Sequence, residues 1–338
     1  MKGISVIICC YNSGNKLIPT LSHLAKQQSL PNIPYELIIV NNNCINNTIE
    51  IATGNWKVLG SPFALTVVQQ TTPGLSYARE KGVQTARFDY LVLCDDDNWF
   101  CDDYLLKVFR LMETMPETAL IGGVGEAVAD IPIPGWFKAL NGFGYAVGDE
   151  GRTTGYVDSL YGAGMGIRKS VFIQLMNSGF SFILSDRTGN KLSSGGDTEL
   201  CLLVKNAGHK IYLDSSLSFK HFLNKERLQW PYYLALRKSF GKAAAYLYLY
   251  HVINPGNQLI PKKSRARQFV LLMKYSIINI KYSLFPSLFQ NAECANFVQQ
   301  RSIQLTRLFE NKNMKVKADN IARQLKEKRT LQKAKHVY

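Results

Sequence analysis

Three short apolar runs in the first hundred residues constrain the fold most. They are Ile4–Cys10, Tyr35–Val40 and Tyr90–Cys94, and each ends in a cluster of polar residues. Runs of this length bounded by turn residues indicate buried strands, and the segments 16–28 and 76–86 between them indicate helices. Strands that alternate with helices predict an α/β domain whose parallel sheet is covered on both faces.

Polar side chains follow each predicted strand. Tyr11 and Asn12 follow the first, Asn41 and Asn43 the second, and Asp95–Asp97 the third. Ligands of such sheets bind beyond the C-terminal strand ends, so we expect these residues to converge there. Neither GxGxxG after the first strand nor GxxxxGK[ST] anywhere occurs, so a dinucleotide fingerprint and a P-loop are unsupported.

The acidic triplet is the strongest chemical signal. Three adjacent carboxylates raise the energy of their ionised state, and a bound Mg²⁺ or Mn²⁺ relieves it while keeping water and substrate phosphates as further ligands. The alternative is an acidic turn that caps the next helix, as Asp102 and Asp103 would do before Tyr104.

These motifs, in their order, resemble family 2 glycosyltransferases of the GT-A fold over roughly residues 1–240. The matching blocks are Ser5–Asn12, Ile38–Asn43, Gly74–Gly82, Leu93–Asp97, Tyr161–Arg168, Ser194–Cys201 and His221. The resemblance implies an α/β, Rossmann-like mixed sheet flanked by helices. Residues 1–100 would form the nucleotide-sugar half and residues 101–240 the acceptor half, followed by a basic, mainly helical C-terminal region over 241–338.

The resemblance also implies which residues bind the donor. A DxD motif holds a divalent cation on the donor diphosphate in such enzymes, and Asp95 and Asp97 match its ends. Asp97 would be the direct ligand, Asp95 would lie nearer the ribose or a metal-bound water, and His221 would contact the metal or the diphosphate. The other implied or candidate donor-binding residues are Tyr11, Asn12, Asn41, Asn43, Gly74, Arg79, Asp96 and Arg227.

Several of these assignments have alternatives. His221 follows a predicted strand and could be an ordinary hydrogen-bonded histidine, although neutral imidazole is a competent metal ligand. Arg227 could bind phosphate bidentately or lie on the surface, and Arg79 could face the phosphates or pair with Glu80 or Glu50. Asn41 stands where the family commonly has an aspartate that reads the nucleobase, and an amide can still donate to and accept from uracil.

On the acceptor side, Asp197 matches the base of the family, which uses single-displacement, inverting chemistry. Where the family usually has Glu-Asp, this chain has Gly196 before Asp197, so Asp197 would act alone. Glu199 would point away from it on a helix and is assigned to acceptor binding or structure. Gly164 lies in an acceptor-half block and is a further acceptor-binding candidate.

The stretch Ile131–Phe137 contains two prolines and predicts a loop. That loop would present Trp136 to the sugar acceptor, and the alternative is an aromatic side chain packed on its own domain.

Charge divides the chain. Residues 225–338 contain 22 Lys and Arg against 5 Asp and Glu, whereas residues 1–224 contain 18 against 20. In the basic part, Arg267, Lys274 and Lys281 recur along an otherwise apolar stretch that Pro286 closes. The segment 269–285 is too interrupted to span a bilayer. With the basic run 262–267 it predicts contact with an anionic membrane surface, and the alternative is a helix packed on the catalytic domain.

The remaining sequence features bear on location and on competing functions. Seven cysteines without CxxC spacing indicate reduced thiols, the chain leads straight into its first strand without a signal peptide, and residues 312–338 predict a basic helix that frays. We therefore expect a cytoplasmic enzyme, peripheral on the inner face of the membrane. Its expected partners are a nucleotide-sugar donor, UDP-linked, and a glycan or lipid-linked acceptor of surface polysaccharide synthesis, with Mn²⁺ or Mg²⁺ as cofactor.

Two alternative functions belong to other classes. A sugar-nucleotide nucleotidyltransferase would need a glycine-rich loop with Arg and Lys after the first strand, which residues 11–16 provide poorly. A nucleic-acid binder could use the basic, Tyr-containing C-terminal part, but it would leave the acidic triplet unexplained, so no nucleic acid is expected.

Overall fold

The computed structural model describes residues 1–30, 32–148, 152–178, 180, 182–184, 186, 187, 192–252, 265–310, 313, 314, 316 and 317. The chain forms two compact units. The first comprises Met1–Ile173, Ser185–Lys191 and Gly196–Lys225, and the second comprises Gln174–Leu184, Leu192–Gly195 and Glu226–Tyr338. The division predicted at residue 240 falls inside a continuous helix, α8 (Trp230–Val252).

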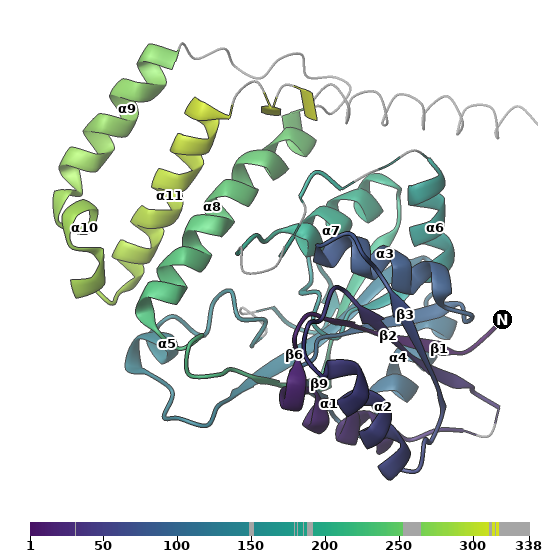
Figure 1. Ribbon diagram of the computed structural model, residues 1–338. Helices are drawn as coiled ribbons and strands as arrows, with labels where there is room; N and C mark the ends of the chain where they lie inside the picture. Colours follow the sequence, from purple (N-terminus) through teal and green to yellow (C-terminus); the bar gives the residue numbers. More distant parts are fainter. Residues whose placement is uncertain are drawn as a thin grey trace, which may run out of the picture. The chain divides into compact units, whose positions relative to one another are not determined.

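Strands and helices alternate at the start of the first unit (Figure 1). The strands are β1 (Ile4–Cys10), β2 (Tyr35–Asn41), β3 (Ala64–Gln69) and β4 (Tyr90–Cys94), and the helices are η1 (Gly14–Lys16), α1 (Leu17–Ala25), α2 (Thr48–Val58) and α3 (Leu75–Thr85). All four strands pair in parallel, β1 lying between β2 and β4. The three predicted strands and both predicted helices are confirmed, whereas β3 was not predicted.

β1, β2 and β4 are buried on both faces, which explains their continuous apolar runs. On one face Ile4, Val6 and Ile8 belong to a core that includes residues of α1, α2 and α4 (Tyr104–Thr114). On the other face Ile7 packs against Gly82 of α3, where an added Cβ would lie 2.4 Å from Ile7 Cγ2. The glycine allows α3 to approach the sheet closely.

The later strands make the sheet mixed. They are β5 (Asn98–Phe100), β6 (Thr118–Val128), β7 (Gly155–Tyr156), β8 (Gly166–Arg168) and β9 (Lys210–Phe222). Among the described residues the strand order is β3-β2-β1-β4-β8-β6-β9-β5, with β7 paired to β9. β8 runs antiparallel to both β4 and β6, whereas β6 and β9 are parallel. β5 is antiparallel to β9, and its Asn98 lies opposite His221 in the register. The topology thus brings the segment after the acidic triplet to the end of β9.

The remaining helices associated with the sheet are α5 (Gly135–Ala139), α6 (Lys169–Asn177) and α7 (Gly196–Asn206). The loop predicted over residues 131–137 is wrong for its last three residues, which begin α5. Pro134 is the N-cap of this helix with φ of −61°. A proline is compatible with a helix start because its missing N–H has no intrahelical partner there.

The described part of the second unit is helical. α8 packs against α11 (Ala292–Phe309), and α11 also packs against α9 (Arg265–Ile278), with α10 (Ile280–Leu284) and η2 (Pro286–Leu288) linking α9 to α11. Within the described ranges no helix has both the length and the apolar character needed to cross a bilayer. The basic run at 262–264 and most of the predicted helix 312–338 lie outside the described residues.

Candidate active site

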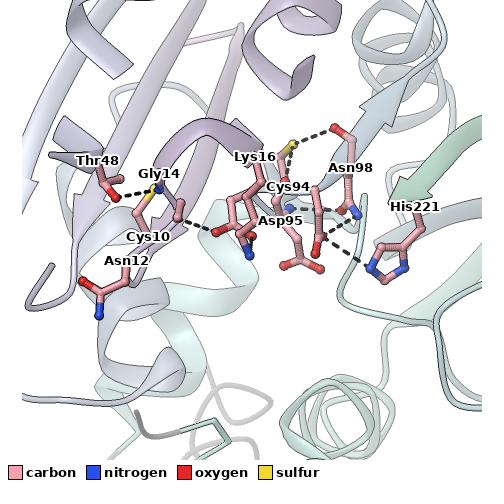
Figure 2. Close-up of polar contacts among 12 residues, drawn as sticks. Cys10, Asn12, Gly14, Lys16, Thr48, Cys94, Asp95, Asn98 and His221 are labelled. Carbon is pink, nitrogen blue, oxygen red and sulfur yellow. Dashed lines mark hydrogen bonds and ion pairs between the residues drawn. The ribbon is translucent and has the colours of Figure 1, made fainter. Parts of the chain in front are cut away.

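The C-terminal ends of β1 and β4 meet through Asp96. Its carboxylate accepts a hydrogen bond from the Ser13 hydroxyl and pairs with Lys16 Nζ at 2.9 Å. In the turn after β1 the Gly14 N–H donates to the Thr48 hydroxyl at 2.9 Å (Figure 2). Asp96 therefore anchors the loop after β1, and a lysine stands beside the acidic triplet.

Asp97 and His221 are in direct contact. Asp97 Oδ1 lies 3.3 Å from His221 Nε2, and both side chains are buried. The Asn98 amide donates to Asp97 Oδ1 at 3.5 Å and accepts from the Asp95 N–H at 3.0 Å (Figure 2). A carboxylate and an imidazole in one buried place are ligand types that Mn²⁺ accepts.

Asp95 lies within electrostatic reach of this pair. Burial and the nearby Asp97 carboxylate raise the pKa of Asp95, while Arg79 and His221 act in the opposite direction. A divalent cation would relieve this repulsion between like charges. Among the described residues no three His, Cys, Asp or Glu side chains are arranged as a complete metal site. The arrangement suits a cation held by one or two protein groups, with substrate phosphates completing its coordination.

Asparagines shape the loops after β1 and β2. Asn12 and Asn43 both have positive φ, 54° and 63°. Asn12 Oδ1 accepts from the Ile45 N–H at 2.8 Å, and Asn41 Oδ1 accepts from the Cys44 N–H at 2.9 Å. Asn43 Nδ2 donates to the Thr71 carbonyl at 2.8 Å. The side-chain amides of these three predicted donor-binding residues thus form hydrogen bonds with backbone groups in this structure. Their contacts with a donor remain predictions.

The Asp197 carboxylate is held by two donors. Its Oδ1 accepts from Arg79 Nη1 at 2.6 Å, and its Oδ2 accepts from the Gly162 N–H at 2.8 Å. A Cβ on Gly162 would lie 2.3 Å from Asp197 Oδ1, so only glycine fits beside this ion pair. Arg79 also contacts Asp186 Oδ2 at 3.3 Å, rather than the predicted Glu80 or Glu50. The Asp197 side chain keeps 35% of its surface exposed, enough to meet a substrate hydroxyl.

The other predicted residues differ in exposure. Gly74, with φ of 139°, is buried where α3 begins. The Gly164 carbonyl accepts from the Tyr104 hydroxyl at 2.8 Å, which is a structural contact. Glu199 is fully buried on α7, and Trp136 is buried, which favours its packed alternative over the exposed platform that was predicted.

The last two donor-binding candidates belong to different units of the chain. Tyr11 is 42% exposed at the end of β1, where a ring can stack on a ligand. Arg227 belongs to the second unit and is half-buried before α8. Its contact with a diphosphate remains a prediction.

Sequence reasoning missed four polar residues of the site: Ser13, Lys16, Asn42 and Asp186. Asn42 is buried, donates to the carbonyls of Gln70 and Thr72, and accepts from the Gly74 N–H at 2.9 Å. It therefore fixes the loop that begins α3. The sequence offered one indication of this role, because Asn42 lies between the predicted site residues Asn41 and Asn43. Successive side chains of an extended segment alternate in direction, so the middle one points away from its two neighbours.

The chain is similar to known glycosyltransferases. The sequence model of the family described as "Glycosyl transferase family 2" matches residues 5–175. The putative glycosyltransferase EpsH of Bacillus subtilis (strain 168) is 29% identical over 107 residues, which are 32% of this chain and 29% of that protein. The uncharacterized glycosyltransferase YwdF of the same strain is 30% identical over 112 residues, 33% of this chain and 38% of that protein.

Two proteins of Staphylococcus aureus extend the comparison. The poly-beta-1,6-N-acetyl-D-glucosamine synthase of strain MSSA476 is 26% identical over 113 residues, 32% of this chain and 26% of that protein. The chain thus spans between 26% and 38% of the length of these three relatives. The crystal structure of S. aureus TarS 1–349 in complex with UDP-GlcNAc matches with a TM-score of 0.50 and 15% identity, covering 90% of this chain and 91% of that one.

These findings confirm the predicted fold and class of enzyme. The family match begins in β1 and ends in α6, so it contains the acidic triplet and Arg79. It extends over half of the 338 residues, and the structural match extends over nine-tenths of them. The mixed sheet with its flanking helices is the GT-A arrangement that was predicted. The chain therefore belongs to glycosyl transferase family 2.

Proposed function

We propose that this protein is a metal-dependent, inverting glycosyltransferase that moves a sugar from a nucleoside diphosphate sugar to a glycan or lipid-linked acceptor. One observation carries the proposal. Asp97 lies 3.3 Å from His221, and in the same compact unit Asp197 lies 2.6 Å from Arg79, whose positive charge also acts on Asp95. A group suited to a leaving diphosphate and a group suited to an acceptor hydroxyl are thus neighbours.

On the donor side, Asp97 and His221 would hold Mn²⁺ or Mg²⁺, with Asp95 beside them. The bound cation supplies positive charge that stabilises the departing nucleoside diphosphate. Lys16 lies at the same strand ends, paired with Asp96, and can add charge near the phosphates. Tyr11 has the exposure needed to stack on the nucleobase.

On the acceptor side, Asp197 would accept the proton of the attacking hydroxyl. Its two hydrogen bonds, from Arg79 and Gly162, fix the orientation of the carboxylate before a substrate arrives. Proton removal by a positioned carboxylate favours attack in a single displacement, which inverts the anomeric carbon.

The relatives indicate which substrates to test first. The structurally similar TarS was crystallised with UDP-GlcNAc, and one relative is a poly-beta-1,6-N-acetyl-D-glucosamine synthase. We therefore propose a UDP-linked donor and a role in surface polysaccharide synthesis. Family membership weighs against the nucleotidyltransferase and nucleic-acid-binding alternatives.

A donor screen tests this proposal. Purified protein with Mn²⁺ is offered UDP-, GDP-, CDP- and dTDP-linked sugars, and release of free nucleoside diphosphate is measured with and without chelator. We expect metal-dependent release from a UDP-sugar. Equal release of nucleoside diphosphate with and without chelator would refute the proposal. So would a protein that neither binds nor turns over any of the donors.

We also propose that the second unit contacts an anionic membrane. Large apolar side chains on α9, α10 and η2 are 46–80% exposed, among them Leu271, Ile277, Ile278, Leu284 and Leu288. Lys274 and Lys281 are exposed on the same helices. Apolar side chains interspersed with lysines are suited to the headgroup region, where each basic residue contributes about 1 kcal/mol of attraction.

Vesicle co-sedimentation tests this contact. The full chain should sediment with vesicles that contain anionic lipid, less at high salt and not with neutral vesicles. Leu271→Ser with Ile278→Ser should weaken sedimentation, whereas Val58→Ser, at an apolar position of α2 that is more exposed than either, should not. Equal sedimentation of both variants, or independence of lipid charge, would contradict the proposal.

A further inference from the structure

Gly196 stands beside the predicted base at the position where the family usually has a glutamate. In the structure a carboxylate from elsewhere in the chain lies at this place. Asp186 Oδ1 accepts from the Gly196 N–H at 3.1 Å. A Cβ built on Gly196 would lie 2.3 Å from Asp186 Oδ2, closer than real contacts allow. The Asp186 carboxylate therefore occupies the space that a side chain at 196 would enter, and glycine is required for it.

The two carboxylates share one cation. Arg79 Nη1 lies 2.6 Å from Asp197 and 3.3 Å from Asp186. The Arg79 side chain is 14% exposed and that of Asp186 is 8% exposed, so solvent screens their interaction little. Burial and the charge of Asp197 raise the pKa of Asp186 to about 6, while the nearby Arg79 acts in the opposite direction.

This arrangement determines which charges surround Arg79 when Asp197 takes up a proton. A carboxylate that alone neutralises a buried guanidinium is a weak base, because protonating it would leave the cation unpaired. A second carboxylate on the same guanidinium compensates that charge when Asp197 takes up a proton. Asp186 also accepts from the first N–H of α7, the helix that carries Asp197, and so fixes where that helix begins.

We propose that Asp186 is a positioning residue of the transfer reaction, supplying through Arg79 and the start of α7 the second carboxylate that residue 196 lacks. The inference rests on the proposed function, with Asp197 as base. Asp186 does not touch substrate in this account. It holds Arg79 and keeps Asp197 able to accept a proton.

Two variants separate the charge of Asp186 from its loop contact. Asp186→Asn can still accept from the Gly196 N–H through its amide oxygen, but it removes the negative charge that residue 186 places beside Arg79. The double variant Asp186→Ala with Gly196→Glu abolishes the loop contact and returns a carboxylate from the helix side. Asp158→Asn is the control, since Asp158 pairs with Lys205 at the other end of α7 and its side chain is 90% exposed.

The measurements are sugar transfer, nucleoside diphosphate binding with Mn²⁺, and thermal unfolding of each variant. We expect Asp186→Asn to lower kcat by about tenfold or more with binding unchanged, the double variant to recover part of that loss, and the control to match wild type. Wild-type kcat in Asp186→Asn would overturn the inference, as would a folded double variant without recovery. A wild-type enzyme that turns over no nucleotide sugar would refute the proposed function itself, and the inference with it.

Discussion

Replacing Asp197 with asparagine tests the assignment of the base. The hydrogen bonds of Asp197 also indicate how much the substitution should lower the free energy of unfolding. Both carboxylate oxygens accept, one from Arg79 Nη1 at 2.6 Å and the other from the Gly162 N–H at 2.8 Å. An asparagine has one acceptor oxygen and one amino group. In either orientation its amino group faces a donor, so one of the two contacts is lost.

The variant should therefore lose both activity and some stability. Loss of a general base lowers the rate by about 10²–10⁴-fold. A buried donor left without its acceptor costs on the order of 1–3 kcal/mol. Donor binding should change little, because the proposed metal ligands are Asp97 and His221, which contact one another.

The assay follows sugar transfer under donor saturation, together with calorimetric titration of the nucleoside diphosphate in Mn²⁺ and urea unfolding. Asp158→Asn again serves as the control, because it removes a carboxylate from an exposed ion pair of the same helix. Transfer by Asp197→Asn within a few-fold of wild type would show that another group removes the proton. A loss of donor binding in the same variant would place Asp197 on the donor side.

Further predictions concern stability. Since burial raises the pKa of Asp186 to about 6, the folded chain holds its proton where the unfolded chain has released it, so the contribution of Asp186 falls as pH rises from about 4 to 6. The free energy of unfolding of wild type relative to Asp186→Asn, measured in urea at both pH values, should fall by on the order of 2 kcal/mol, and a pH-independent difference would contradict this. Gly82→Ala should destabilise by about 1–3 kcal/mol because its Cβ meets Ile7 Cγ2 at 2.4 Å. Gly54→Ala on α2, with nothing within 4 Å, should instead stabilise by about 0.5–1 kcal/mol, and equal effects of the two would refute the packing argument.

The fold was predictable where burial is complete. β1, β2 and β4 are covered on both faces, so each appears in the sequence as an uninterrupted apolar run. β3 lies at the edge of the sheet, and more than half of its residues are exposed. It therefore has no such apolar run. The long strands β6 and β9 pair although most of the acceptor half separates them in the sequence. This pairing depends on contacts that no local pattern encodes.

The site was predictable to the same extent. Asp95, Asp97 and Asp197 could be proposed from the sequence because they stand in recognisable motifs at the ends of elements, and their roles remain predictions. Asp186 was missed because it stands ten residues before Gly196 in a segment without periodicity, and only the folded backbone brings it to that glycine. Lys16 was missed as well, because its pairing with Asp96 depends on the meeting of two strand ends.

The central claim is that the acidic triplet and His221 form a metal-dependent donor site, and binding of UDP tests it most directly. Isothermal titration compares wild type with Asp97→Ala, each with Mn²⁺ and with chelator. Asp103→Ala is the control, because the partly exposed Asp103 carboxylate pairs with Lys107. We predict that Mn²⁺ strengthens UDP binding to wild type and to the control, and that it has no effect on Asp97→Ala. A metal effect that persists in Asp97→Ala, or that is absent from wild type, would contradict the account.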